Sequence, residues 1–228
     1  MTNIILQHFD GDLRPLDKLS VSNMTAYANM IGADYKLITG KPFNARLTGA
    51  CQKVYMINEE FDEYDDVCMV DIDMFAPVGM KQNVFEASGV GLHAEVQQML
   101  HKRIVSEFGI SMTDPNKPYW GGAIYKMDRG LRKRLRETLA RDSDDMWMNK
   151  YNQAYHFEDE GIFHTLMVWS SAYLPKDQWY MDRKWCQCSY LPNPEKAGFI
   201  HVRTKITPQG PKRTKMENYQ ALVDKGVL

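Results

Sequence analysis

The sequence predicts an α/β fold with a mostly parallel, Rossmann-like sheet, helices on its faces and an irregular C-terminal third. Within residues 3–39 a strand, a helix and a second strand follow one another, which is the order of a βαβ unit with a parallel pair. A third apolar strand then ends in the acidic sequence Asp-Ile-Asp, and regular patterns fade from Tyr173 onward. With 228 residues, the chain is long enough to bury a sizeable core as a single domain.

In the first half, the elements follow from changes in apolar periodicity. The first strand, NIILQHF, is followed by the breaker Asp-Gly-Asp, and Gly32 ends the helix that comes next. A second helical stripe consists of Val54, Ile57 and Phe61 and leads into the acidic strand. The predicted elements are a strand at 3–9, a helix at 16–31, a strand at 34–39, a helix at 48–64 and a strand at 66–75.

The second half alternates less clearly between strands and helices. The Arg- and Lys-rich segment 128–142 is interpreted as a helix with a solvated basic face, and the Pro- and Gly-punctuated end of the chain as a basic tail. The predicted elements are a strand at 88–94, a helix at 94–110, a strand at 120–127, helices at 128–142 and 159–170, and a short strand at 198–202.

Composition excludes several classes of protein. The 28 basic and 29 acidic residues nearly cancel, so no global charge favours nucleic-acid binding. No segment has the length of a membrane span and the first apolar run is too short for a signal peptide, so we expect a soluble, cytoplasmic protein. Four cysteines, including a lone Cys-x-Cys at Cys186 and Cys188, are expected to be reduced rather than to hold zinc.

The acidic pair Asp71 and Asp73 is the strongest chemical signal. On an extended chain alternate side chains point to one side, so the two carboxylates converge while Ile72 faces away. Like charges at the ligand-binding end of a strand need a cation, and oxygen ligands favour Mg²⁺ or Mn²⁺ together with a phosphate group. Asp65 and Asp66 precede the strand and are interpreted as solvated turn residues. The alternative is that the pair only caps a helix or begins a turn.

The Asp-x-Asp at the end of a strand that follows a βαβ unit resembles the GT-A glycosyltransferases, whose carboxylates hold a divalent metal on a nucleotide-sugar diphosphate. The order of further motifs is similar to the glycogenin and bacterial lipopolysaccharide galactosyltransferase group and to small viral glycosyltransferase domains. The resemblance implies a GT-A fold with a nucleotide-binding half at 1–75, a donor-sugar and acceptor half at 76–200 and a basic C-terminal tail at 201–228.

The resemblance also assigns site residues around the metal and nucleotide. Lys53 occupies the place of a donor-binding basic residue, and FIHVRTK resembles a late element in which a histidine completes the metal shell. The metal ligands implied are Asp71, Asp73 and His201, with Arg203 and Lys205 on the diphosphate. His8, Phe9 and Ile72 are expected to contact the nucleotide, since the first strand ends at His8 and Phe9.

Two further motifs concern the sugars. YWGGAIYKMDR resembles a strand whose small residues let the backbone approach the donor sugar, which implies a substrate-binding role for Trp120, Gly121 and Gly122. Trp179 and Trp185 are further candidate platforms for sugar rings. FEDEGIFHTLM is similar to the family's acidic helix start, although Glu160 stands where glutamine is common; Asp159 or Glu160 is the candidate general base or acceptor-orienting acid.

The function implied is transfer of a sugar from a nucleoside-diphosphate sugar, with UDP expected from the resemblance, to the hydroxyl of a carbohydrate or other acceptor. The cofactor implied is Mn²⁺ or Mg²⁺. The sequence leaves open an inverting or a retaining outcome. Two alternatives remain: a phosphatase or phosphotransferase of the haloacid dehalogenase type, which also uses Asp-x-Asp after a strand, and a carbohydrate-binding protein of the same fold without turnover.

Overall fold

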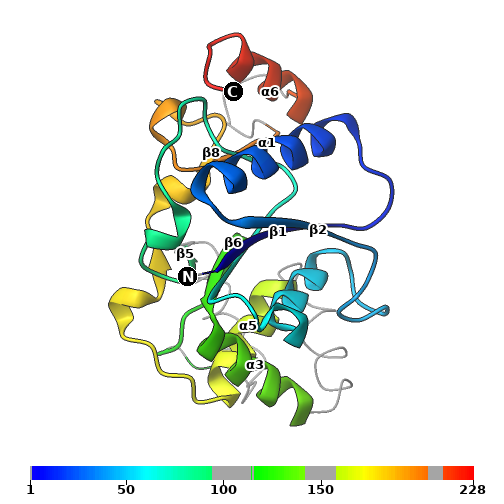
Figure 1. The fold of residues 1–228 in the computed structure, drawn as a ribbon, viewed down its shortest axis with the longest axis vertical. Coiled ribbons are helices and arrows are strands. Elements are labelled where there is room, and N and C mark those ends of the chain that lie inside the picture. The colour runs from blue at the N-terminus through cyan, green and yellow to red at the C-terminus, as the bar shows by residue number, and fades with distance from the viewer. Residues whose placement is uncertain (1, 94–113, 115, 142–157, 205–212) are drawn as a thin grey trace.

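The structure is a computed structural model, which describes residues 2–93, 114, 116–141, 158–204 and 213–228. Its centre is a six-stranded sheet with the order β2-β1-β3-β6-β5-β7. Helix α1 lies on one face of this sheet, and α3 and α5 lie on the other (Figure 1). The strands are β1 Asn3–Phe9, β2 Asp34–Thr39, β3 Asp66–Val70, β5 Gly91–His93, β6 Trp120–Asp128 and β7 Tyr180–Met181; the helices are α1 Pro15–Ile31, α3 Arg129–Arg141 and α5 Glu158–Trp169.

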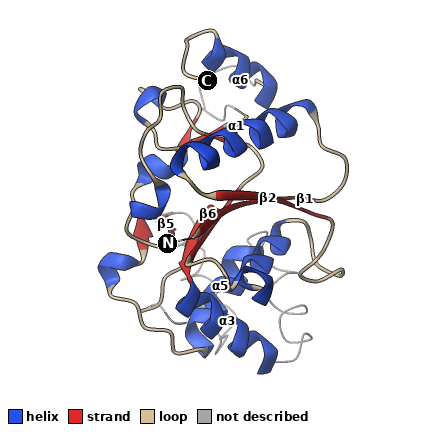
Figure 2. Ribbon diagram, viewed as in Figure 1, coloured by secondary structure: helices blue, strands red, loops and turns tan. Residues whose placement is uncertain are grey.

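The sheet is mixed, with parallel pairs in the majority among the described strands. β1 is parallel to both β2 and β3, and β5 is parallel to β7. β6 is antiparallel to both of its neighbours, β3 and β5. The predicted fold class is confirmed: the strands lie at the centre with helices on both faces of the sheet (Figure 2). Because β1 and β3 are parallel neighbours, their carboxyl ends lie at one edge of the sheet, where open α/β sheets bind ligands.

The central strands form because their side chains are buried on both faces. In β1, Ile4 and Leu6 join the apolar cluster under α5, whereas Ile5 joins the cluster under α1. This alternation follows from the two-residue period of a strand. Helix α1 ends where predicted, at Gly32, which adopts a left-handed backbone with φ of 70°.

A second, three-stranded sheet with the order β4-β9-β8 extends the structure beyond the main sheet. Its strands are β4 Met74–Phe75, β8 Gln187–Cys188 and β9 Ile200–His201. Phe75 packs on Tyr219 of the C-terminal helix α6, Lys215–Val223, with ring centroids 5.1 Å apart. Leu222 completes the same apolar cluster. Residues near the end of the chain are thereby held close to the segment that carries the acidic pair.

The predicted helix over 48–64 is wrong in type. The segment forms two 3₁₀ helices, Ala50–Ile57 and Glu59–Phe61, separated by Asn58. Asn58 has an extended backbone with ψ of 150°, and its side chain accepts a hydrogen bond from the amide of Glu60. Asparagine competes in this way with helical hydrogen bonds, so the apolar stripe is kept while the continuous helix is lost.

The interpretation of residues 201–228 as a basic tail is incomplete. Thr214 and Glu217 form a reciprocal capping box that begins α6, a start signal that the sequence contains but that composition obscures. Two other predictions lie outside the described residues: the helix at 94–110 and the diphosphate contact of Lys205.

The basic face of α3 is not simply solvated. Arg132 is fully buried and donates hydrogen bonds to the backbone carbonyls of Met127, Phe61 and Tyr64. Arg136 forms an ion pair with Asp62, with nitrogen and oxygen 2.7 Å apart. Helix α3 is therefore attached to the segment 61–64, which precedes β3. Among the described helices, none is both long and apolar enough to cross a membrane.

Candidate active site

The acidic pair lies in a turn that follows β3. The amide of Met74 donates to the carbonyl of Asp71 at 3.1 Å, and Ile72 and Asp73 occupy the turn positions between them. The expectation of a continuous strand through Asp73 is therefore wrong. A tight turn brings neighbouring side chains together as an extended strand would, so the two carboxylates still approach one another.

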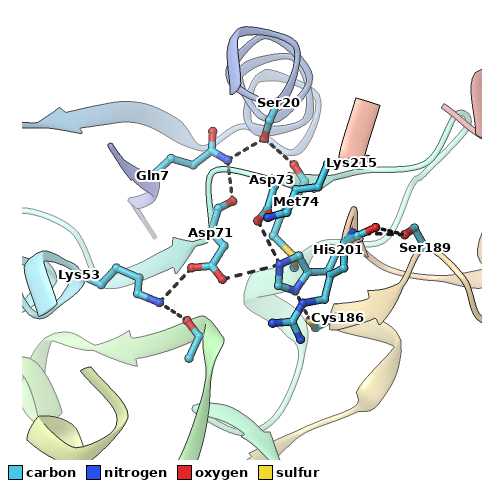
Figure 3. A network of polar contacts seen from close by, with 12 residues as sticks. Gln7, Ser20, Lys53, Asp71, Asp73, Met74, Cys186, Ser189, His201 and Lys215 are labelled. Carbon is cyan, nitrogen blue, oxygen red and sulfur yellow. Dashed lines mark hydrogen bonds and ion pairs between the residues drawn. The ribbon is translucent and has the colours of Figure 1, made fainter. Parts of the chain in front are cut away.

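A buried hydrogen-bond network fixes this turn. The side-chain amide of Gln7 donates to the carbonyl of Asp71 and to the hydroxyl of Ser20, both at 3.0 Å. The Ser20 hydroxyl donates to the carbonyl of Met74 at 2.7 Å (Figure 3). The hydroxyl of Tyr35 donates to the side-chain oxygen of Gln7. Sequence reasoning missed these residues, although a glutamine inside the apolar run NIILQHF was a usable signal, because a buried amide needs partners.

His201 joins the acidic pair from a distant part of the chain. Strand β9 is antiparallel to β4 and places His201 opposite Met74. Its Nε2 lies 3.0 Å from Oδ1 of Asp73 and 3.9 Å from Oδ2 of Asp71 (Figure 3). One ligand atom from each of the three residues lies within 4.8 Å of the others. Two carboxylates and one imidazole are a donor set that suits Mn²⁺ or Mg²⁺, so the residues fit the implied metal.

The partners of Asp73 stabilise its negative charge, and a partner of His201 orients the imidazole ring. Burial raises the pKa of Asp73, but His201 and Lys215 outweigh it and hold that pKa below the ordinary range of an aspartate. Cys186, one of the four free cysteines, lies with its Sγ 3.7 Å from Nδ1 of His201. An outer partner on Nδ1 leaves Nε2 directed at the carboxylates.

Lys53 connects the acidic pair to a second acidic group. Its Nζ lies 2.9 Å from Oδ1 of Asp71 and 2.8 Å from Oδ2 of Asp159, and it donates to the carbonyl of Gly122 at 2.5 Å. Burial lowers the pKa of Lys53, and the carboxylates of Asp159 and Asp71 raise it further than burial lowers it. Lys53 is therefore charged, and its ammonium is already engaged by protein groups.

Asp159 and Glu160 lie in the first turn of α5 and approach the backbone of Gly122. The amide of Gly122 donates to Oε1 of Glu160 at 2.6 Å, and Tyr125 donates to Asp159 at 3.0 Å. A Cβ atom at Gly122 would lie 2.8 Å from Oδ2 of Asp159. The glycine is needed so that these carboxyl groups can approach β6.

Glu160 is held in its neutral form at neutral pH. Burial and the nearby charge of Asp159 raise its pKa from 4.5 to about 8, against the lowering effects of the Gly122 amide and Lys53. Its second oxygen, Oε2, is buried without a hydrogen-bond partner in the described part of the chain. A buried acid of this kind can donate a hydrogen bond, as a glutamine amide would.

Glu160→Gln tests this protonation through stability. The raised pKa of Glu160 contributes stability below about pH 4.5, and this contribution is lost as the pH rises through the folded pKa of about 8. The amide does not titrate, so between about pH 5 and about pH 8 the free energy of unfolding of the variant is expected to rise by about 4 kcal/mol relative to the wild type. Urea unfolding at several pH values measures the difference, and a constant difference would show that Glu160 is ionised throughout.

A cavity of about 340 Å³ opens beside the acidic pair, at the carboxyl ends of β1 and β3. Four of the predicted nucleotide-contacting residues line it: His8, Phe9, Lys53 and Ile72. The Nε2 of His8 lies 2.6 Å from the carbonyl of Gly40, and burial lowers its pKa, so the ring is neutral at neutral pH. Asp10, Gly49 and Ala50 also line the cavity and were not predicted.

Other predicted site residues do not line this cavity. Trp120 is fully buried and its indole nitrogen donates to the carbonyl of Trp179, so it offers no face to a sugar ring and that expectation is wrong. Trp185 is buried in the same way, while Gly121 lies buried in β6 beside Gly122. Arg203 is exposed just beyond β9, and its carbonyl accepts a hydrogen bond from Asn218.

Asp65 and Asp66, both expected in a solvated turn, lie in different environments. The side chain of Asp65 is 44% exposed and forms an ion pair with Arg129 at 2.9 Å, in keeping with its expected place in a turn. Asp66 instead begins β3 and is half-buried, and burial raises its pKa. The expectation of a solvated turn is wrong for Asp66.

Solved structures of glycosyltransferases have an architecture similar to that of this chain. A glycosyltransferase involved in glycosylation of the major capsid of PBCV-1 matches with a TM-score of 0.56 at 10% identity, over 98% of this chain and 100% of the other. The galactosyltransferase LgtC, in complex with donor and acceptor sugar analogs, matches with a TM-score of 0.54 at 12% identity, over 97% and 95%. No protein-family model and no curated protein sequence matches. The chain has the fold of the GT-A glycosyltransferases.

Proposed function

We propose that this protein is a metal-dependent glycosyltransferase that moves a sugar from a nucleoside-diphosphate sugar, with UDP as the nucleotide, to an acceptor hydroxyl. The observation that carries the proposal is the convergence of Asp71, Asp73 and His201 beside a cavity at the ligand edge of the sheet. The similar solved structures, whose titles name glycosyltransferases, support the same activity. Asp71 and Asp73 come from segment 1–75 and His201 from segment 201–228, which supports the proposal of one catalytic domain.

Different residues would bind the metal ion and the nucleotide. Asp71, Asp73 and His201 would hold Mn²⁺ or Mg²⁺, which supplies positive charge for the leaving diphosphate. The cavity residues His8, Phe9 and Ile72 would take the base and ribose. Arg203 and Lys205 follow β9 in sequence and would add charge-assisted contacts to the diphosphate.

The second acidic group would position the sugars. Asp159 is engaged by Lys53 and Tyr125, which favours an orienting role over proton abstraction. Glu160 in its neutral form can donate a hydrogen bond to a sugar oxygen. Gly121 and Gly122 would allow the sugar to approach β6, although both polar groups of the Gly122 backbone have partners in the protein.

The phosphatase alternative is less favourable. A haloacid dehalogenase nucleophile usually follows the first strand, whereas Asp71 follows β3. Asp71 also forms an ion pair with Lys53 and so is already constrained. A carbohydrate-binding protein without turnover would use the same cleft, and only an activity measurement separates it from an enzyme.

The decisive experiment incubates the protein with a panel of UDP-sugars and Mn²⁺ and measures released UDP. We expect slow UDP release without acceptor and a rise in melting temperature when UDP and Mn²⁺ are added together, because a ligand that binds only the folded state stabilises it. The control omits the metal. Absence of both UDP release and metal-dependent stabilisation, across other nucleoside diphosphates as well, would contradict the proposal.

A further inference from the structure

Asp73 is a buried carboxylate whose two oxygens each have a different partner. Oδ1 lies 3.0 Å from Nε2 of His201, and Oδ2 is paired with the ammonium group of Lys215 (Figure 3). The side chain of Asp73 is only 7% exposed. A carboxylate at this depth needs a positive partner, and Lys215 provides one where the ligand set would otherwise recruit a metal ion.

Lys215 reaches the site from the separate C-terminal helix. Helix α6 is anchored independently of the ion pair, because Tyr219 packs on Phe75 and Asn218 donates to the carbonyl of Arg203 at 2.6 Å. Leu222 adds an apolar contact. The Lys215 side chain is 37% exposed, so its head group has access to water. The ammonium can therefore leave Asp73 without undocking the helix.

A divalent ion and Lys215 oppose one another at this carboxylate. An ion held by Asp71, Asp73 and His201 brings a double positive charge next to the lysine ammonium, and like charges at such short range repel even at an effective dielectric constant of about 20. We propose that Lys215 is a built-in competitor of the divalent ion: the ammonium and the ion are alternative charge partners of Asp73. The C-terminal helix thereby sets how tightly the site holds metal. This inference rests on the metal site of the proposed function.

The test measures Mn²⁺ binding to the full chain without nucleotide, through the loss of the free Mn²⁺ electron paramagnetic resonance signal. Lys215→Met keeps most of the stem but removes the charge, and is expected to bind Mn²⁺ about tenfold more tightly than the wild type. Lys215→Arg keeps the charge and is expected to stay near the wild type. The matched control is Lys225→Met, which removes an exposed lysine beyond the same helix.

Each outcome decides a different point. Equal or weaker Mn²⁺ binding by Lys215→Met, or an equal gain in Lys225→Met, would overturn the competition. If neither the wild type nor Lys215→Met binds Mn²⁺, the metal site itself is contradicted, and with it the metal dependence of the proposed function. Binding by the wild type without a gain in Lys215→Met leaves the proposed function intact and rejects only the inference.

A second measurement follows the lysine directly. Labelling with an amine-reactive reagent, read by mass spectrometry, is expected to increase at Lys215 when Mn²⁺ is added, because the metal takes Asp73 and frees the ammonium. Lys225 is exposed and serves as the internal reference in the same sample. Labelling of Lys215 that does not respond to saturating Mn²⁺ would mean that the lysine keeps its partner, which contradicts the competition.

Discussion

Lys53→Met is expected to lower the free energy of unfolding by about 3–5 kcal/mol, since removing one partner of a buried ion pair leaves the other uncompensated. The variant would leave Asp71 and Asp159 without their shared cation, and Asp159 is only 4% exposed. The carbonyl of Gly122 would lose its donor as well. Urea unfolding at neutral pH measures the loss.

Two comparisons make this result specific. Lys36→Met removes an exposed pair with Glu60, at 3.1 Å, and is expected to cost less than about 1 kcal/mol. The double variant Lys53→Met with Asp159→Asn removes both charges and is expected to recover part of the loss. Equal costs for the two lysines would mean that the bridge between the acidic groups contributes no more than a surface pair.

Asp71→Asn is expected to weaken Mn²⁺ binding on the order of 100-fold or more, because the neutral amide lacks the negative charge with which the carboxylate attracts the divalent ion. UDP release from UDP-sugar with Mn²⁺ is expected to fall with it. Asparagine keeps the size of the side chain, and the turn is held through the backbone carbonyl of Asp71, so the fold is expected to persist. Mn²⁺ titration and circular dichroism measure the two effects separately.

The same acidic stretch provides the control for this variant. Asp65→Asn removes a carboxylate that pairs with Arg129 on the surface, away from the site, and is expected to leave Mn²⁺ binding unchanged. A folded Asp71→Asn variant with the metal affinity of the wild type would remove Asp71 from the ligand set. A loss in both variants would indicate a general charge effect.

Much of the fold was predictable because local patterns and global packing agree. The βαβ unit follows from the apolar strands and from Gly32, whose left-handed backbone ends α1. Apolar periodicity did not predict the break at Asn58 or the helix after Thr214, because hydrogen bonds between side chains and the backbone decide both, at Asn58 and in the Thr214–Glu217 capping box. Trp120 was expected to contact the sugar, but it is buried in the core. A tryptophan in a strand has the same sequence pattern whether it packs in the core or faces a ligand.

The sequence by itself determined that two aspartates follow a buried strand, and the physical cost of that arrangement already predicted a cation nearby. Only the tertiary structure decided which side chains meet these carboxylates. The β4–β9 pairing brings His201 to Asp73, the 3₁₀ segment brings Lys53 between Asp71 and Asp159, and α6 brings Lys215. These contacts join residues far apart in the chain, so no local periodicity encodes them; they depend on which surfaces pack together.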